Sequence, residues 1–179
     1  RSSRPVCATW YDCRLNREGT LARRWRPTVG SSIDRYLTML ELLAGDVIRE
    51  LDGVPEDILN RPVDVPEANS LFAIATHLLA SGRNWTLVVI GGQDIPRDRD
   101  AEFVATGTFA ELTSGYDEWM RATHEVLDGA SDDERGRVTE QTPYRPDLAV
   151  EFMTVEHGLI HVIDHTAIHL GHMQVTKQL

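Results

Sequence analysis

Cysteine is nearly absent from this sequence: Cys7 and Cys13 both lie in the first thirty residues, and residues 31–179 contain none. Residues 31–179 therefore have no disulfide framework, no cysteine nucleophile and no thiolate ligand for a metal ion. Metal chemistry there would have to use histidine, aspartate or glutamate. We expect the two cysteines to be free thiols in a reducing cytoplasm, with a local bridge between them as the alternative.

Long apolar runs and an excess of positive charge are also missing. No segment approaches the roughly 20 apolar residues needed to cross a bilayer, so we expect no membrane partner. The net charge of the chain is −10, which argues against a nucleic-acid partner. With 41% apolar and 26% charged residues, the composition is that of an ordinary globular protein.

The charge is unevenly distributed along the chain. Residues 1–30 contain seven arginines against Asp12 and Glu18, a net charge of +5, so the other 149 residues carry −15. We expect residues 1–30 to be an unstructured basic segment foreign to the fold, because they show no apolar periodicity. A nucleic-acid-binding arm or a targeting peptide is the alternative. Residues 31–179 are expected to form one domain.

Four segments show the three- and four-residue spacing of apolar residues that is typical of amphipathic helices. We expect helices over about 31–51, 70–90, 108–129 and 148–177, with Gly158 and Gly171 interrupting the last one too weakly to break it. No segment alternates like a β-strand. The predicted fold class is therefore all-α, a four-helix bundle with long crossover links at 54–69 and 91–107.

Histidine is concentrated in the last predicted helix, which contains five of the seven: His157, His161, His165, His169 and His172. Two histidines four residues apart on a helix can bind one metal ion, and the sequence offers three such pairs. Spacing alone cannot choose among them.

The angle of each histidine from the apolar stripe of its helix does favour one pair. At about 100° per residue, His169 lies about 40° and His165 about 80° from the centre of the stripe. His172 lies near 100°, His161 near 120° and His157 near 160°, where we expect solvent. His77, about 75° from the stripe of the second helix, is a possible partner. A metal site is the favoured interpretation, with hydrogen-bonded core histidines or a pH-sensitive helix face as alternatives. Glu156 or Asp164 could replace one ligand, although Asp164 points away from the stripe.

Two of these segments resemble known motifs. His161 followed by residues 164–173, DHTAIHLGHM, resembles the closing signature of the DinB/YfiT-like family, which reads approximately H-x-x-[ND]-H-x-x-x-H-x-G-Q. Residues 69–77, NSLFAIATH, followed by Trp85, resemble the second helix of that family. The two motifs cover residues from about 31 to 179.

The resemblance implies a four-helix bundle of DinB/YfiT-like type that holds one divalent ion, commonly zinc or nickel. By position, the ligands would be His77, His165 and His169. His172 stands where the family usually has glutamine, and it could be a fourth ligand or a hydrogen-bond donor to one. Family members with tested activity include thiol S-transferases and mycothiol-dependent isomerases, and homodimers are frequent.

These observations lead to three hypotheses of function. The first is a metal-dependent S-transferase or isomerase that uses a low-molecular-weight thiol such as mycothiol, bacillithiol or a glutathione-like compound, with a small-molecule substrate. The second is a metal-dependent hydrolase, in which the same ion activates water. The third is a non-catalytic metal-binding module of a stress response. No catalytic residue beyond the metal ligands is assigned.

Overall fold

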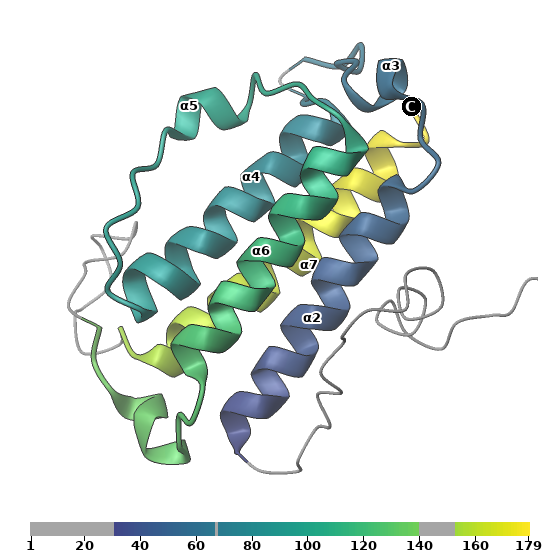
Figure 1. Cartoon of the computed structure of the whole chain (residues 1–179). Helices are drawn as coiled ribbons and strands as arrows, with labels where there is room; N and C mark the ends of the chain where they lie inside the picture. The colour runs from purple at the N-terminus through teal and green to yellow at the C-terminus, as the bar shows by residue number, and fades with distance from the viewer. Residues whose placement is uncertain (1–30, 67, 140–152) are drawn as a thin grey trace, which may run out of the picture. The chain divides into compact units, whose positions relative to one another are not determined.

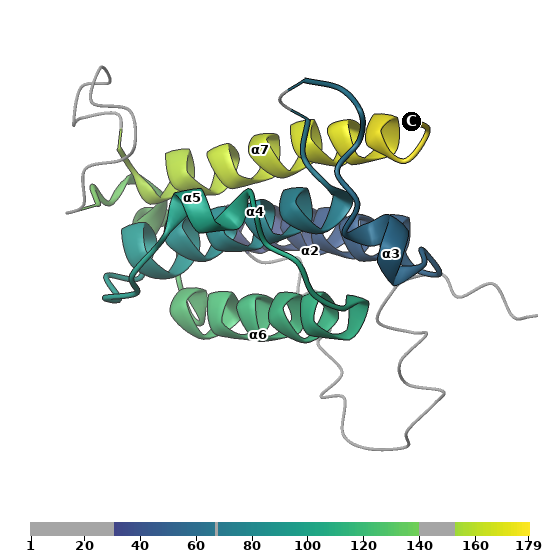
Figure 2. The same cartoon turned by 90° about the horizontal axis from the view of Figure 1, so that it is seen from above.

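Four long helices form a bundle in the computed structural model, which describes residues 31–66, 68–139 and 153–179. They are α2 (Ser32–Leu51), α4 (Leu71–Arg83), α6 (Phe109–Leu127) and α7 (Val155–Thr176). Viewed from above, α6 and α7 lie on opposite sides of α2 and α4, and each packs against both of them (Figure 2). The described residues contain no strand, only an isolated bridge between Val138 and Thr154. The predicted all-α class is confirmed.

The helices begin and bury their faces as the sequence predicts. Ser31 with Asp34, and Thr108 with Glu111, form complete capping boxes at the start of α2 and α6. The apolar residues spaced three and four apart along α2 are all buried: Ile33, Leu37, Leu40, Ala44, Val47 and Leu51. None of the described helices is long and apolar enough to span a membrane.

The second predicted helix changes its winding after Arg83. Residues Asn84–Ile90 continue α4 as a π-helix, η1, in which Trp85 is buried. A π-helical turn rotates the side chains that follow it relative to an uninterrupted α-helix. The sequence predicts one continuous helix over 70–90 and gives no sign of this change.

The last helix begins later than the sequence predicts. The side chain of Thr154 accepts a hydrogen bond from the backbone N–H of His157 and so caps α7 at Val155. Met153 lies outside the helix, and its carbonyl accepts a hydrogen bond from the backbone N–H of Thr139. The start predicted at 148 lies outside the described residues. From Val155 onward, α7 runs continuously through Gly158 and Gly171, as predicted.

The links carry short helices and set the direction of the long ones. The 54–69 link contains α3 (Glu56–Leu59), and the 91–107 link contains α5 (Arg99–Glu102). The 91–107 link runs back along α4 to the end where α4 begins, so α4 and α6 point the same way (Figure 1). The amide of Asn60 joins the two links by hydrogen bonds of 2.8 Å to both the N–H and the carbonyl of Gly107.

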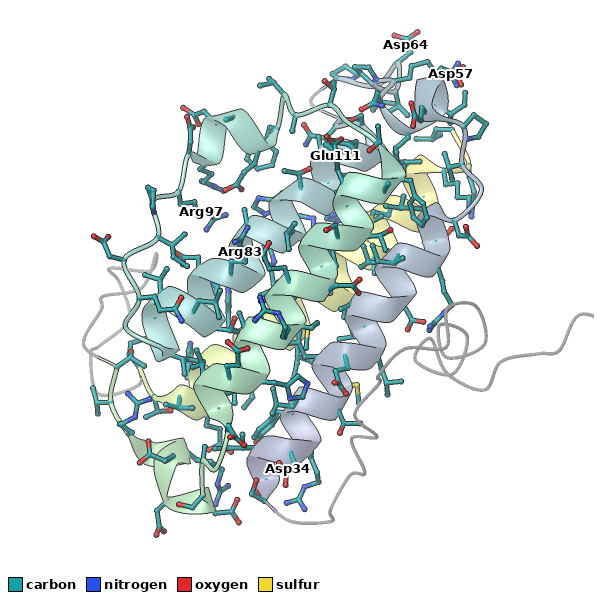
Figure 3. The ribbon with its side chains drawn as sticks, viewed as in Figure 1. Asp34, Asp57, Asp64, Arg83, Arg97 and Glu111 are labelled. Atoms are coloured by element: carbon teal, nitrogen blue, oxygen red, sulfur yellow. The ribbon has the colours of Figure 1, made fainter. Side chains whose placement is uncertain are left out.

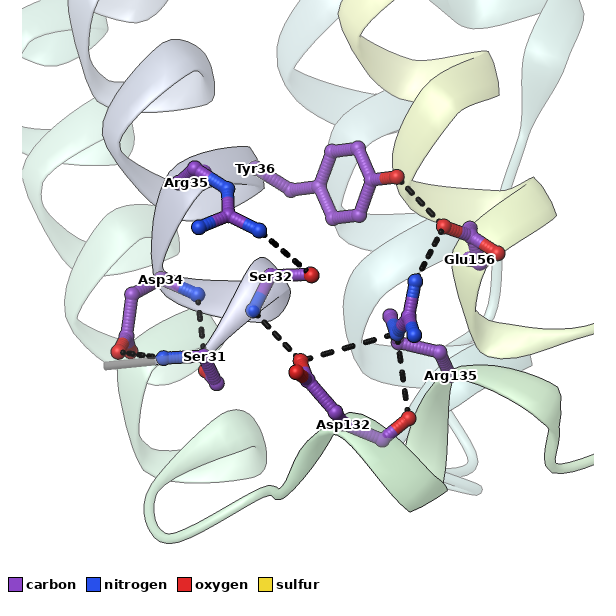
Figure 4. Close-up of polar contacts among 8 residues, drawn as sticks. All are labelled: Ser31, Ser32, Asp34, Arg35, Tyr36, Asp132, Arg135 and Glu156. Atoms are coloured by element: carbon purple, nitrogen blue, oxygen red, sulfur yellow. Dashed lines mark hydrogen bonds and ion pairs between the residues drawn. The ribbon is translucent and has the colours of Figure 1, made fainter. Parts of the chain in front are cut away.

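A network of polar contacts joins α2, α7 and the 3-10 helix η2 (Asp132–Gly136) at the other end of the bundle (Figure 4). The Tyr36 hydroxyl donates to Glu156 at 2.6 Å, and Arg135 contacts the same carboxylate oxygen at 3.3 Å. The backbone N–H of Ser32 donates to Asp132 at 2.6 Å. The carboxylate of Glu156 is therefore bonded to Tyr36 and Arg135 near the start of α7. The expectation for residues 1–30 lies outside the described residues and stays a prediction.

Candidate metal centre

Three histidines from two neighbouring helices meet between α4 and α7. His77 comes from α4, and His165 and His169 come from successive turns of α7. Each offers one ring nitrogen, and these three atoms lie within 4.8 Å of one another. The structure thus brings together the three residues that the sequence singles out. That they ligate an ion stays a prediction.

Hydrogen bonding fixes which nitrogen of His77 is available. Its Nδ1 lies 2.8 Å from a carboxylate oxygen of Glu102, which can only accept, so Nδ1 carries the proton and donates it. Nε2 of His77 therefore presents a lone pair, and it lies 3.3 Å from Nε2 of His165. The remaining nitrogen of His165, Nδ1, is buried and has no hydrogen-bond partner among the described residues. Facing ring nitrogens need a proton or a cation between them, so this donor set fits a divalent ion.

Glu102 is held by a second partner. It is only 5% exposed, and the guanidinium of Arg97 grips both carboxylate oxygens, at 2.6 and 2.9 Å. Burial alone would raise the pKa of Glu102, but the hydrogen bonds from Arg97 and His77 outweigh it and lower that pKa. Glu102 is therefore a carboxylate at neutral pH, and it fixes the ring orientation of His77.

All three imidazoles are neutral at physiological pH. Burial lowers the pKa of His77 more than the neighbouring Glu102 raises it. Burial, followed by the neighbouring His169, lowers the pKa of His165 to about 3, and burial with the nearby His77 lowers that of His169 to about 4. A neutral imidazole is the form that binds a metal, so protons compete weakly for these nitrogens at neutral pH.

Aromatic rings pack against the histidines on two sides. Phe103 stacks on His77, with the ring centroids 4.8 Å apart and an angle of 27° between the planes. His161 lies between Trp85 and His165, with centroid distances of 4.4 and 5.7 Å. His161 is half-buried, because Trp85 of the π-helical segment packs against its ring.

The other candidate ligands lie outside the triad. His172 is exposed, and its Nδ1 lies 3.3 Å from Nδ1 of His169, which places it as a neighbour of one predicted ligand. His157 is half-buried, where the sequence predicts solvent, and Asp164 is exposed. Glu156 bonds Tyr36 and Arg135 instead.

Sequence reasoning missed Arg97, Glu102 and Phe103. All three belong to the 91–107 link, which has no periodic pattern that could place a side chain. The one available signal is Asp98, whose side chain caps α5 by accepting from the backbone of Ala101 and so positions Glu102.

Comparison with known proteins identifies the family of this chain. In the comparison with curated proteins, no match was found. The family model of mycothiol-S-transferases matches residues 36–179, which is most of the chain and includes all three histidines. The chain therefore belongs to the mycothiol-S-transferase family, within the DinB/YfiT-like group.

Proposed function

We propose that this protein transfers a low-molecular-weight thiol, mycothiol being the first candidate, to an electrophilic small molecule at a metal ion held by His77, His165 and His169. One observation carries the proposal: in a chain of the mycothiol-S-transferase family, three neutral imidazoles from two helices converge on one point. Zinc and nickel are the proposed metals. A homodimer in the cytoplasm is the proposed working form.

A divalent ion held by these neutral ligands would keep its full positive charge and would favour the thiolate form of a thiol beside it at neutral pH. Such a thiolate would bond to the electrophilic carbon of the acceptor, and the leaving group would depart with the electron pair of the bond that breaks. The residues of this chain prepare that step. Glu102 and Arg97 keep the proton of His77 on Nδ1, so the lone pair of Nε2 stays available to a metal ion. Phe103 stacks on His77, and the Trp85–His161 pair flanks His165, so apolar ring surface borders the site on two sides.

The test is a conjugation assay with chlorodinitrobenzene as electrophile and mycothiol, bacillithiol or glutathione as thiol. The protein is stripped with a chelator and reloaded with zinc or nickel, and the uncatalysed rate is subtracted. We expect metal-dependent conjugation with at least one of the thiols, and its loss in His169→Ala.

Two results would contradict the proposal in different ways. Thiol-independent, metal-dependent cleavage of p-nitrophenyl acetate with no conjugation would favour a hydrolase. A large fall in melting temperature on metal removal, with no activity of either kind, would favour an ion that only braces the bundle.

A further inference from the structure

A cavity of about 260 Å³ lies between α4 and the 91–107 link. Its apolar wall includes Leu79, Val88 and Pro96, and its polar wall includes Thr76, Arg83 and Arg97. None of the three predicted metal ligands lines it. Glu102 belongs to the cavity wall and also bonds Nδ1 of His77. The cavity therefore lies next to the candidate metal centre, on the Nδ1 side of His77.

Arg83 stands in this wall with an unsatisfied donor. Its Nε is buried and has no hydrogen-bond partner among the described residues. The hydroxyl of Thr76, two helical turns earlier on the same face of α4, is also buried without a partner. A buried donor left without an acceptor costs free energy, so two such groups in one cavity wall indicate a ligand that would satisfy them.

The charges around the cavity leave Arg83 uncompensated. Arg97 is paired with Glu102 through both carboxylate oxygens, and that pair is neutral as a whole. Asp98, the remaining acidic residue of the wall, is exposed and caps α5. Figure 3 shows Arg83 and Arg97 in the space between α4 and the link. The N–H groups of Arg97 that do not face Glu102 are further hydrogen-bond donors.

We propose that this cavity binds the carboxylate of a small molecule through Arg83, with the apolar body of that molecule packed on Leu79, Val88 and Pro96. A guanidinium presents a planar fork of N–H groups that matches a carboxylate, and a partly buried fork gains more from such a partner than an exposed one does. The carboxylate belongs either to the acceptor of the transfer reaction or to a separate molecule. The site is independent of the metal, because no predicted ligand contributes to it.

The test is calorimetric titration of the full chain with sodium benzoate, a planar carboxylate with an apolar ring. The protein is kept metal-free with a chelator, so that a carboxylate cannot bind at the metal centre. We expect saturable binding at one site, and a Kd at least tenfold weaker in Arg83→Gln. Benzamide, which has the same shape without the charge, should also bind at least tenfold more weakly. Arg121→Gln, which changes an exposed arginine of α6 paired with Glu125, should leave the Kd unchanged.

Several outcomes would overturn the proposal: no saturable binding, equal affinity in Arg83→Gln, or binding that occurs only after zinc is restored. If Arg83→Gln loses its helical circular dichroism, Arg83→Lys replaces it in the test. Lysine keeps the positive charge but lacks the planar fork of N–H groups, so the Kd for benzoate should rise several-fold. Where transfer activity is present, competition of benzoate with the electrophile would identify the acceptor as the source. An unchanged KM for the electrophile would identify a separate molecule.

Discussion

Glu102 decides which nitrogen of His77 is available to a metal. It accepts the Nδ1 proton at 2.8 Å, and the fork from Arg97 prevents the carboxylate from turning away. A partner of this kind fixes the tautomer and orientation of a ligand histidine, and its loss typically lowers metal affinity roughly 10- to 100-fold.

Replacing Glu102 by glutamine should weaken zinc binding by roughly 10- to 100-fold, because the amide can turn its NH2 toward His77 and cannot take both donors of Arg97 as a carboxylate does. Competition with a chromogenic chelator measures the change. Glu125→Gln is the matched control, since Glu125 is an exposed partner of Arg121 on α6. Equal zinc affinity in the two variants would show that Glu102 does not support metal binding.

Replacing His169 by alanine should abolish tight binding of one divalent ion, whereas His157→Ala should retain it. His169 supplies one of the three converging nitrogens, while His157 does not belong to that group. Elemental analysis of both variants, purified side by side, gives the metal content. Equal loss of metal in both, or metal retained in both, would refute the ligand assignment.

The melting temperature of the metal-free protein should fall as the pH falls from about 6.5 toward 4. The unfolded chain protonates its imidazoles near 6.5, but the folded pKa values of His165 and His169 are about 3 and 4. Between these limits the unfolded state binds more protons, so acid favours unfolding. Differential scanning fluorimetry of the wild type and His165→Ala compares the slopes. A slope equally steep in the variant would contradict the assignment.

A glycine allows α4 and α6 to pack closely together. A Cβ on Gly82 would lie 2.2 Å from the ring of Trp119, so only glycine lets this buried indole lie against α4. The indole N–H of Trp119 donates a hydrogen bond to the hydroxyl of Thr86 at 2.9 Å. The same hydroxyl lies 2.9 Å from the hydroxyl of Thr123. This close contact holds the helix that carries His77.

Gly82→Ala should destabilise the fold by about 1–3 kcal/mol, because the rigid indole and backbone must shift to accept a methyl group.

Gly171→Ala is the opposite case, since nothing lies within 4 Å of its added Cβ in α7. It should stabilise the protein by about 0.5–1 kcal/mol through helix propensity. Urea unfolding of the metal-free variants measures both, and changes of the same sign would contradict the packing described for Gly82.

Elements with a repeating pattern were predictable, and elements without one were not. The apolar stripe of α2, and the angles of His165 and His169 from the stripe of their helix, follow from helix geometry, so the bundle and the meeting of the three histidines could be predicted. The partners Glu102 and Arg97 lie in a link, where tertiary contacts decide the position of each side chain. The contact of His161 with Trp85 could not be foreseen either, because it depends on the π-helical turn that carries Trp85. The late start of α7 depends on the pairing of Met153 with Thr139, which are distant in sequence.

At the scale of the whole molecule, the match to the mycothiol-S-transferase family begins at residue 36, close to the start of α2. Removing residues 1–30 should therefore leave the melting temperature of the remaining domain unchanged, because these residues have no apolar stripe to bury. Scanning calorimetry of the full and shortened chains is the comparison. A fall of many degrees would mean that aromatic residues such as Trp10 or Trp25 pack on the bundle.

The separation of the three histidines along the chain has a consequence for biosynthesis. His77 lies on α4, but its two companions lie on α7, which follows α2, α4 and α6 in chain order. While the ribosome is still making α6, the chain offers a single imidazole from this group, and one such ligand holds a metal ion only weakly. An ion held by all three histidines would therefore bind only after α7 has been synthesised and has packed against α4.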